Sequence, residues 1–599
     1  MAEFVDRLRY AALVMPFIVF LSVPNGAQQI PDAGHRQFFI NCSAATQGDG
    51  SRTHPWNSLT GAEAHSFMPG DQIALARATV CRGDFSPHGS GTKDRPIRIT
   101  AYGRGPRPRI VAPASDRQVL LLFNQQYWQI DSLDLSGANT YGIFVTGDSG
   151  TLHHIYLENL YVHDAVGGEM KRKDNGLVVV GPSSLHVFFS DILVDGVVAA
   201  HTNQWAGILI GGGPFPYKAD APLNSRVTVR NSSVHDVYGD GIVLFRDSNS
   251  VIETSTAWET GMQPTETIGT PNAIWTWTCT DCIVRDNEAF LTDSPGVDGG
   301  AYDIDWDNTR NTVERNYGHD TQGYCFAVFA AGYVTSESVV RDNLCVDNGQ
   351  SPRLAALQGA AYLHSWNGGV LRGLRIEHNT FVWNPPVSSA AAIVDDAGAP
   401  APVTFTNNRI DSTAPLLYRI SAPFAPTEND YRYNGTGEAK LTLDGRHKVT
   451  LAALQQAGFE RGTTLEAKPA PAQLATRLRL DASVDFALDA DGLLAARPRA
   501  QLMVLRSLAA QYGAAALAVT VHLRVDLNSA ANKDARDNAL LDLDAGPIRF
   551  DYKSNQVGVI RLLAADGRLL EEWHGFQNAA ALGGAVRARL GVPRFAQMR

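Results

Sequence analysis

The sequence predicts an all-β solenoid in which short strands stack coil upon coil. Nine β-rich segments recur at intervals of 23 to 41 residues, and each places an Asn or another small polar residue before a turn. Their strands alternate apolar and polar residues, and none shows helical periodicity. The 54 Gly and 30 Pro have no three-residue period, which indicates many turns rather than collagen. The recurring polar residues are Asn159, Ser190, Asn231, Thr254, Asn287, Asn316, Asn343, Asn379 and Asn408.

These recurring residues are predicted to belong to the scaffold. Asn tolerates a left-handed backbone at a turn, and its amide can hydrogen-bond the equivalent residue of a stacked coil. Coils of similar length with insertions between them are typical of a solenoid.

Length and charge exclude several classes of protein. The 599 residues are 44% hydrophobic, which is ample for a core. The 51 Lys and Arg against 61 Asp and Glu give a net charge of −10, and there is no long run of one sign. This pattern excludes a basic nucleic-acid-binding surface and a disordered acidic tail. We expect no nucleic acid as a partner.

The N-terminus predicts an export signal over residues 1–27. Arg7 and Arg9 precede an apolar run over residues 10–23, and the small residues Gly26 and Ala27 follow it. The run is shorter than the roughly 20 residues that cross a bilayer, and no later segment is long and apolar enough. We therefore expect a secreted or periplasmic protein without a membrane span in the mature chain.

Six cysteines, an even number, suit an oxidising compartment. Cys42 with Cys81 is the first disulfide that we predict. Cys279 and Cys282 form a single CxxC without a second one or a helical His pair, so a structural role is favoured over zinc or redox chemistry.

Short turn-and-strand segments near the N-terminus, together with the repeats, resemble the right-handed parallel β-helix (pectate lyase-like) superfamily of secreted polysaccharide-degrading enzymes. The resemblance covers residues 36–430 and implies a polysaccharide substrate bound on the coils. We expect a monomer, with an N-terminal cap that shields the open edge of the first coil. The segments are Phe38–Cys42, Gly48–Gly50, His54–Trp56, Pro69–Asp71 and Pro96–Gly103.

The composition changes after the solenoid. We predict a β-helix with its N-terminal cap over 36–430, a helix and linker over 431–470, and a β-rich, sandwich-like accessory domain over 471–599. A short helix is expected at Val449–Gly458 and a Pro/Ala linker at Ala467–Pro471, and Val519–Leu527 is the clearest later strand.

Asp303, Asp305 and Asp307 form the sharpest local signal. On a strand they share one face, with Ile304 and Trp306 on the other, because side chains alternate with a period of two. Neighbouring like charges raise the affinity for a proton or a cation. The three carboxylates are thus predicted to be catalytic acid and base, or to bind a calcium that anchors a uronate. The alternatives are a solvated acidic face or a calcium that only stabilises the coils.

His319 and His235 lie in the coils nearest to this acidic strip, and each precedes an Asp, as His163 does. Repeated turn chemistry explains most of these pairs. A neutral His319 could act as a base while its carboxylate neighbour fixes the tautomer, and His235 could contact substrate. Asp240 begins a strand and is either a turn residue or a further carboxylate at the substrate.

Five other residues, three Trp, one Arg and one Lys, are predicted to contact substrate. The register aligned on the Asn residues points Trp275 and Trp277 inward, but a slip of one residue would turn them outward as sugar-stacking platforms. Trp205 lies beside a longer insertion. Arg246 is either a base or an ion-pair partner, and Lys173 lies in a basic loop that could bind an anionic sugar or only be solvated.

These residues favour hydrolysis of a glycosidic bond, which needs two carboxyl groups and no cofactor. The alternative is calcium-assisted β-elimination on a uronate-containing glycan. A non-catalytic glycan-binding or adhesin solenoid is the third hypothesis. The chain has neither the motif series of polygalacturonases nor a clear pectate-lyase base motif, so no residue role is transferred from those enzymes.

Overall fold

The structure is a computed structural model that describes residues 36–167, 174–212, 223–263, 270–397, 403–420, 424–435, 438–442 and 447–467. In the C-terminal part it describes residues 478–486, 517–525, 548–551 and 559–574, with seven single positions between 501 and 589. The predicted signal peptide and Lys173 lie outside the described residues.

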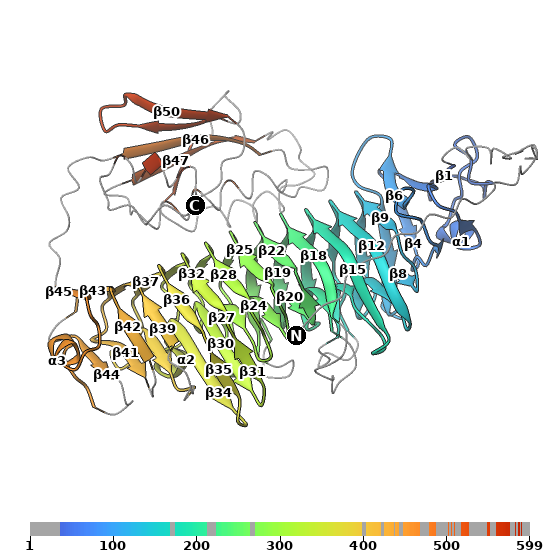
Figure 1. The fold of residues 1–599 in the computed structure, drawn as a ribbon. Coiled ribbons are helices and arrows are strands. Elements are labelled where there is room, and N and C mark those ends of the chain that lie inside the picture. The colour runs from blue at the N-terminus through green and yellow to red at the C-terminus, as the bar shows by residue number, and fades with distance from the viewer. Residues whose placement is uncertain are drawn as a thin grey trace, which may run out of the picture.

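Each full coil contributes one strand to each of three long sheets, and neighbouring strands in these sheets are parallel. The coils stack along one axis from the N-terminal to the C-terminal end of the solenoid (Figure 1). Sheet 1 contains β1 (Gln37–Ile40), β3 (Gln72–Ala76), β6 (Ile97–Tyr102), β9 (Trp128–Asp131), β12 (Gly150–Glu158), β15 (Val187–Asp195), β18 (Asn224–Arg230), β21 (Asp247–Ser248), β22 (Val251–Glu253), β25 (Ile283–Arg285), β28 (Thr312–Glu314), β32 (Val339–Arg341), β36 (Arg375–Glu377), β39 (Val403–Thr406) and β42 (Phe424–Thr427).

The chain turns from sheet 1 into sheet 2 and then into sheet 3 within each coil. Sheet 2 contains β4 (Val80–Arg82), β7 (Arg109–Ala112), β10 (Asp134–Gly137), β13 (Tyr161–His163), β16 (Val198–Thr202), β19 (Ser233–Val237), β23 (Thr256–Thr260), β26 (Glu288–Phe290), β29 (Tyr317–His319), β33 (Leu344–Val346), β37 (Thr380–Trp383), β40 (Arg409–Ser412), β43 (Asp430–Tyr433) and β45 (Thr464–Ala467). Sheet 3 contains β8 (Gln118–Phe123), β11 (Tyr141–Thr146), β14 (Gly176–Val180), β17 (Ala206–Gly211), β20 (Asp240–Phe245), β24 (Asn272–Trp277), β27 (Gly300–Ile304), β30 (Phe326–Ala331), β34 (Ala361–Trp366), β38 (Ile393–Asp395), β41 (Leu416–Ile420) and β44 (Lys440–Thr442).

Short elements decorate this frame. Two small pairs join β2 (Ser66–Phe67) to β5 (His88–Gly89) and β31 (Val334–Ser336) to β35 (Val370–Arg372). The helices are α1 (Leu59–Glu63), α2 (Pro352–Gln358) and α3 (Leu451–Gln456), and α3 falls within the segment predicted to be helical. No helix among the described residues is long and apolar enough to cross a membrane.

The core of the solenoid consists of inward-facing side chains that stack from coil to coil. Ile242 of β20 pairs in register with Ile274 of β24, and both are completely buried. Alternation along a strand places such residues inside and their sequence neighbours outside. The predicted Cys42–Cys81 disulfide is confirmed, and Cys325 bonds Cys345. Cys279 and Cys282 form no disulfide and lie in this core.

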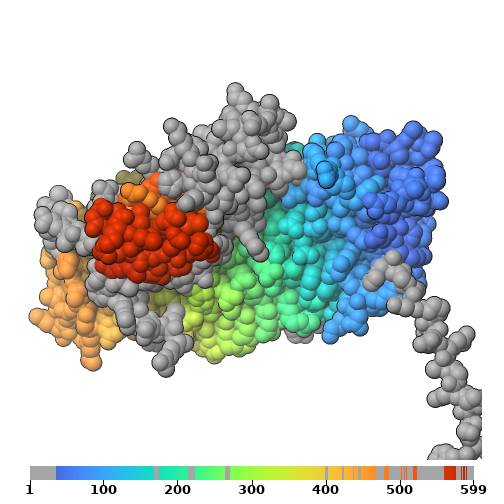
Figure 2. Space-filling view, turned by 90° about the horizontal axis from the view of Figure 1, so that it is seen from above, coloured from blue at the N-terminus to red at the C-terminus, as the bar shows by residue number. Residues whose placement is uncertain are grey.

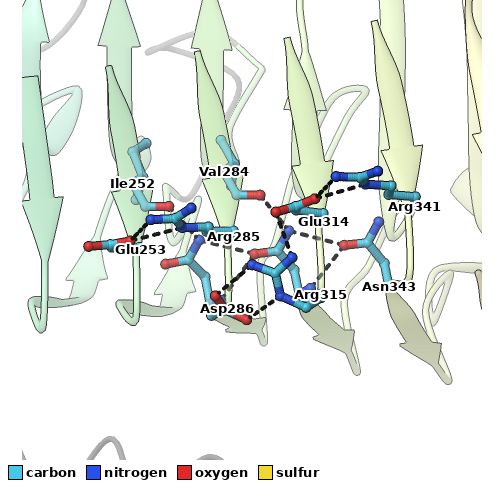
Figure 3. A network of polar contacts seen from close by, with 11 residues as sticks. Ile252, Glu253, Val284, Arg285, Asp286, Glu314, Arg315, Arg341 and Asn343 are labelled. Carbon is cyan, nitrogen blue, oxygen red and sulfur yellow. Dashed lines mark hydrogen bonds and ion pairs between the residues drawn. The ribbon is translucent and has the colours of Figure 1, made fainter. Parts of the chain in front are cut away.

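The recurring Asn residues form a buried ladder between sheets 1 and 2. The backbone N–H of Asn316 donates to Oδ1 of Asn343 at 2.9 Å, and Figure 3 labels this Asn343. The same bond recurs at Asn287, Asn379 and Asn408. A left-handed residue precedes each ladder residue, such as Asp342 at φ +57°. A single residue is predicted to have the left-handed backbone and also to hydrogen-bond the next coil. The structure divides these roles between two neighbours: the first residue has the left-handed backbone, and the second forms the ladder.

Three of the predicted equivalences are wrong for this reason, and a fourth, that of Ser190, is wrong because this residue lies elsewhere in its coil. Asn159, Asn231 and Thr254 occupy the left-handed position, with φ between +48° and +51°, rather than the ladder position. The ladder runs instead through Ser255, whose N–H donates to Asn287 Oδ1 at 2.9 Å. Ser190 lies inside β15 and not at this turn.

Ion pairs on the surface beside the ladder also join neighbouring coils (Figure 3). Arg285 contacts Glu253 at 2.6 Å, and Arg341 contacts Glu314 at 2.6 Å. Each pair links one strand of sheet 1 to the next strand. Both arginines are about one-third exposed, whereas Glu314 is buried. Ion pairs open to solvent contribute about 1 kcal/mol or less.

The C-terminal part forms a separate mixed sheet of five strands. Their order is β48 (Ile548–Asp551), β47 (Leu517–Val525), β46 (Leu478–Phe486), β49 (Val559–Leu563) and β50 (Leu569–His574). It has its own core cluster, which includes Leu505 and Leu582 at helical positions. One sheet is present among the described residues of this part. It lies over the coils in the view of Figure 2.

Candidate functional site

A pocket of about 520 Å³ lies on sheet 3. Its lining comes from β30, β34, α2, the residues just after β27 and β38, and the loop that precedes β27. The lining residues are Thr270, Val297, Asp298, Asp305, Trp306, Phe329, Leu357, Gln358, Tyr362, His364, Trp366 and Asp396.

Strand register explains why residues so far apart in sequence meet in this pocket. Phe329 of β30 pairs with His364 of β34, and the residues after β27 and β38 continue the same row. The row reads Asp305, Phe329, His364, Asp396. The residues that precede the first three pack in the core, so the row faces outward.

β34 presents three rings on its outer face. Tyr362, His364 and Trp366 alternate along the strand, and the ring centroids of each neighbouring pair are 5.3 Å apart with interplanar angles of 10° and 22°. Tyr362 is 6% exposed and Trp366 38% exposed. The rings therefore form a flat wall that becomes more accessible from Tyr362 to Trp366.

His364 is oriented by a carboxylate. Its Nδ1 lies 2.5 Å from Oδ1 of Asp396, and Tyr362 OH lies 3.5 Å from the other carboxylate oxygen. In a neutral imidazole this contact keeps the proton on Nδ1 and leaves Nε2 as an acceptor. Burial, reinforced by the nearby Asp396 charge, raises the pKa of Tyr362, so its hydroxyl remains protonated.

Asp298 is held in an uncommon backbone conformation at the edge of the pocket. Its φ is +65°, in the left-handed region. The side-chain amide of the fully buried Gln358 accepts from Asp298 N at 2.9 Å and donates to Asp298 O at 3.2 Å. Gly323 approaches so closely that a Cβ there would lie 2.0 Å from Asp298 O. These contacts fix the backbone of Asp298 and therefore the position from which its carboxylate side chain extends.

Two arginines anchor α2 at this place. Arg353 of α2 donates to the carbonyl oxygen of Gly296, in the loop that carries Asp298. Arg419 of β41 donates to the carbonyl oxygen of Leu357 at 2.9 Å. Neither guanidinium lines the pocket. Their charges therefore position the wall of the pocket rather than face a ligand.

The pocket is lined by acidic rather than basic side chains. The described residues that line it include three carboxylates, one imidazole and neither Lys nor Arg. Its lining also includes four aromatic side chains, Trp306, Phe329, Tyr362 and Trp366. Few polar groups among aromatic rings are typical of ligand sites, and flat rings suit the C–H faces of sugars.

The predicted acidic strip is not a strip. β27 ends at Ile304, so the alternation that would align the three carboxylates stops there. Asp303 is 2% exposed and accepts from Asn272 Nδ2 at 3.2 Å, whereas Asp307 lies in a turn at φ +64°. Of the three, Asp305 alone lines the pocket. Asp303 and Asp305 share the outer face as predicted, but the expectation of one exposed strip of three carboxylates is wrong, because Asp303 is buried and the strand ends before Asp307.

The separation of these three side chains also argues against the predicted calcium site. Among the described residues, no group of three or more His, Cys, Asp or Glu side chains could hold a metal ion. Asp303, Asp305 and Asp307 therefore do not fit the predicted calcium site as arranged here, and no reaction step is derived through calcium.

Asp240 and Asp303 belong to a buried network behind the pocket. Asp240 Oδ1 accepts from the backbone N–H of Asn272 at 2.7 Å, and Tyr324 OH donates to Asn272 Oδ1 at 2.9 Å. The Tyr324 ring crosses Gly300, where a Cβ would lie 2.0 Å from it. The network holds the start of β27, and Asp240 is not among the pocket residues.

The predicted register of the tryptophans is off by one residue. Trp275 pairs with Val243 and Asp303, not with Ile304, and Trp277 pairs with Phe245. Both tryptophans therefore lie on the outer face of sheet 3, where an apolar cluster that includes Trp205 buries them. Arg246 is also buried, at 4% exposure, next to this cluster and not in the pocket.

The histidines lie on sheet 2, away from the pocket. His319 Nδ1 is 2.7 Å from Asp320, and its Nε2 is 3.1 Å from Glu288. Burial lowers the pKa of His319, but the hydrogen bonds to both carboxylates outweigh it and the net pKa is raised. His235 stacks on Trp258 with centroids 4.4 Å apart. His319 belongs to β29, the first strand of sheet 2 after β27 in the chain, but both histidines lie on a different sheet from Asp305, and neither lines the pocket.

Several pocket residues were not predicted from the sequence. Tyr362, His364 and Trp366 carry a readable signal, because rings at alternate positions of a strand share a face. Asp298, Gln358 and Asp396 carry none, since their roles depend on contacts between coils.

Comparisons with known proteins agree with this architecture. A family model described as right handed beta helix region matches residues 118–410. A search of curated proteins finds no match.

Solved structures with similar coils include carbohydrate-acting enzymes of two kinds. The GH136 lacto-N-biosidase from Eubacterium ramulus is 20% identical, with 62% of this chain and 68% of that chain covered and a TM-score of 0.49. An alginate lyase from Paenibacillus sp. str. FPU-7 is 14% identical, with 68% and 98% covered and a TM-score of 0.27. A mannuronic acid specific polysaccharide family 6 lyase from human gut microbiota is 11% identical, with 73% and 92% covered and a TM-score of 0.35. None is similar enough to indicate the reaction of this chain.

Proposed function

We propose that the pocket on sheet 3 of this parallel β-helix is the active site of a glycoside hydrolase that acts on an uncharged glycan. The observation that carries the proposal is the lining itself: three carboxylates and four aromatic rings without a Lys or Arg. Asp298 and Asp305 are the proposed acid and base.

Hydrolysis of a glycosidic bond needs two carboxyl groups. One protonates the oxygen of the leaving sugar, and the other activates water or attacks the anomeric carbon. Asp396 orients His364 at 2.5 Å, so we assign the acid and base roles to the other two carboxylates of the lining, Asp298 and Asp305. Asp305 Oδ1 also accepts from the backbone N–H of Trp306 at 2.8 Å, which orients its carboxylate. The clamp of Gln358 on Asp298 supports a defined position for the other carboxylate.

β-Elimination is less compatible with the same lining. It requires neutralisation of the substrate's own carboxylate and a base to remove the proton beside it. The described lining supplies no cationic side chain for the first task, and three further carboxylates would repel a uronate. A lyase with this lining would need a bound cation to neutralise the substrate carboxylate, whereas hydrolysis needs none.

Export of the protein is part of the proposal. The Cys42–Cys81 and Cys325–Cys345 disulfides support an oxidising compartment, where a polysaccharide would be met. We propose a monomer without a nucleic acid partner. Activity outside the cytoplasm also suits the predicted signal peptide.

Asp→Asn variants test the catalytic pair. Asp305→Asn and Asp298→Asn are each expected to lower kcat by about 100- to 10,000-fold, the usual contribution of a general acid or base. Asp307→Asn is the matched control, because Asp307 lies two residues from Asp305 but outside the lining. Full activity of Asp305→Asn, or an equal loss in Asp307→Asn, contradicts the assignment. Binding without any cleaved product would identify a non-catalytic glycan-binding protein.

A further inference from the structure

We propose that the outer face of β34 is a sugar-binding subsite, in which the Trp366 ring stacks on a pyranose and Nε2 of His364 accepts a hydrogen bond from one of its hydroxyls. The inference rests on the proposed function, because it names a subsite of the same pocket. It concerns a sugar that is held beside the bond to be cleaved.

The first observation in favour of the subsite is the arrangement of the rings on β34. His364 and Trp366 lie two residues apart on one strand, with ring centroids 5.3 Å apart and planes 22° apart. Phe329 of β30 meets Trp366 edge to face at 5.9 Å and supports it from the neighbouring coil. A ring supported in this way keeps one orientation, which lowers the entropic cost of binding.

The second observation in favour of the subsite is the exposure of apolar side chains at the pocket. Trp366, Val297 and Leu357 are 38 to 40% exposed, although each is a large apolar side chain, and all three line the pocket. Exposed apolar side chains that gather at one place mark binding sites. The pocket therefore has an apolar rim, whereas Tyr362 at 6% exposure belongs to its interior.

The rings, hydrogen-bond acceptors and acidic residues of the pocket indicate the chemical class of its ligand. The rings favour a sugar face that presents C–H groups, and Nε2 of His364 and the exposed Asp396 carboxylate accept hydrogen bonds from hydroxyls. Asp396 and the other acidic residues disfavour a carboxylate on the sugar. The subsite is thus expected to take an uncharged pyranose with free hydroxyl groups next to its stacking face.

Binding of the full chain to an array of neutral and uronate-containing oligosaccharides tests this subsite. The Asp305→Asn variant is used, so that bound glycans are not cleaved. We expect neutral glycans to bind and Trp366→Ala to weaken binding about tenfold through loss of stacking. His364→Phe keeps a ring but removes Nε2, and a loss of about two- to tenfold is expected. Phe123→Ala, which removes a 46% exposed ring from β8 of the same sheet, should change nothing.

Steady-state kinetics separate this inference from the proposed function. For a hydrolysed substrate, Trp366→Ala should raise KM about tenfold and leave kcat nearly unchanged, the signature of lost uniform binding. Hydrolysis with an unchanged KM in Trp366→Ala overturns the subsite but not the hydrolase. Neutral glycans bound through Trp366 without hydrolysis overturn the hydrolase but not the subsite. Binding of no neutral glycan, or equal losses in Phe123→Ala, overturns the subsite.

Discussion

The adjacent residues Asn407 and Asn408 allow a sharp test of how the coils are held together. Asn408 is 1% exposed, and its Oδ1 accepts from the backbone N–H of Asn379 at 2.9 Å. Its Nδ2 donates to Ile376 O at 2.9 Å and to Asn429 Oδ1 at 3.4 Å. Asn407 is exposed, has φ +56° and makes one weak side-chain bond, to its own neighbour.

The expected magnitudes follow from these contacts. Asn408→Ala leaves the buried N–H of Asn379 without its acceptor, at a cost of about 1–3 kcal/mol, and removes several further hydrogen bonds at about 1 kcal/mol each. We expect a total loss of about 3–5 kcal/mol in the free energy of unfolding. Asn407→Ala places Ala in a left-handed position, which costs about 1 kcal/mol.

Urea unfolding of the full chain, followed by far-ultraviolet circular dichroism, measures both variants under one set of conditions. The account predicts that Asn408→Ala is less stable than Asn407→Ala by at least about 2 kcal/mol. Equal stabilities would refute the division of the turn into a left-handed residue and a ladder residue.

Three further predictions concern single side chains. His319 has a raised pKa, so the stability that its contacts give should be complete below pH 6.5 and be lost as the pH rises through the raised value; a pH-independent difference between wild type and His319→Gln would contradict this. Burial raises the pKa of Asp395 to about 7, so its carboxyl should lower stability by up to about 4 kcal/mol between about pH 4 and pH 7, and Asp395→Asn should remove that slope from urea titrations. Gln358→Glu keeps an acceptor for Asp298 N but not a donor to Asp298 O, and kcat should fall about 10- to 100-fold with little change in KM; an unchanged kcat would exclude a positioning role.

The sequence was sufficient for the repeat architecture because that architecture is periodic. Short alternating strands and recurring Asn residues identify coils, whatever their insertions. It was insufficient for register, because Asn159 and Asn287 are the same residue type in two adjacent backbone positions. That one-residue error placed Trp275 on the wrong face, since side chains change face at every step along a strand.

The candidate site was found only in part. Asp305 was chosen as part of an exposed strip of three carboxylates, of which Asp303 proves to be buried and Asp307 lies in a turn beyond the strand. Its neighbours in the pocket come from coils up to 91 residues later in the sequence, as Asp396 shows. Such contacts depend on coil length and on the α2 insertion, which periodicity does not encode.

Product analysis tests the central claim most directly. The purified chain is incubated with neutral and uronate-containing polysaccharides, with and without EDTA, and both new reducing ends and the ultraviolet absorbance of unsaturated uronates are measured. The account predicts reducing ends from a neutral glycan, no such absorbance, no effect of EDTA, and loss of activity in Asp305→Asn. Unsaturated products that disappear with EDTA would contradict it and identify a calcium-dependent lyase.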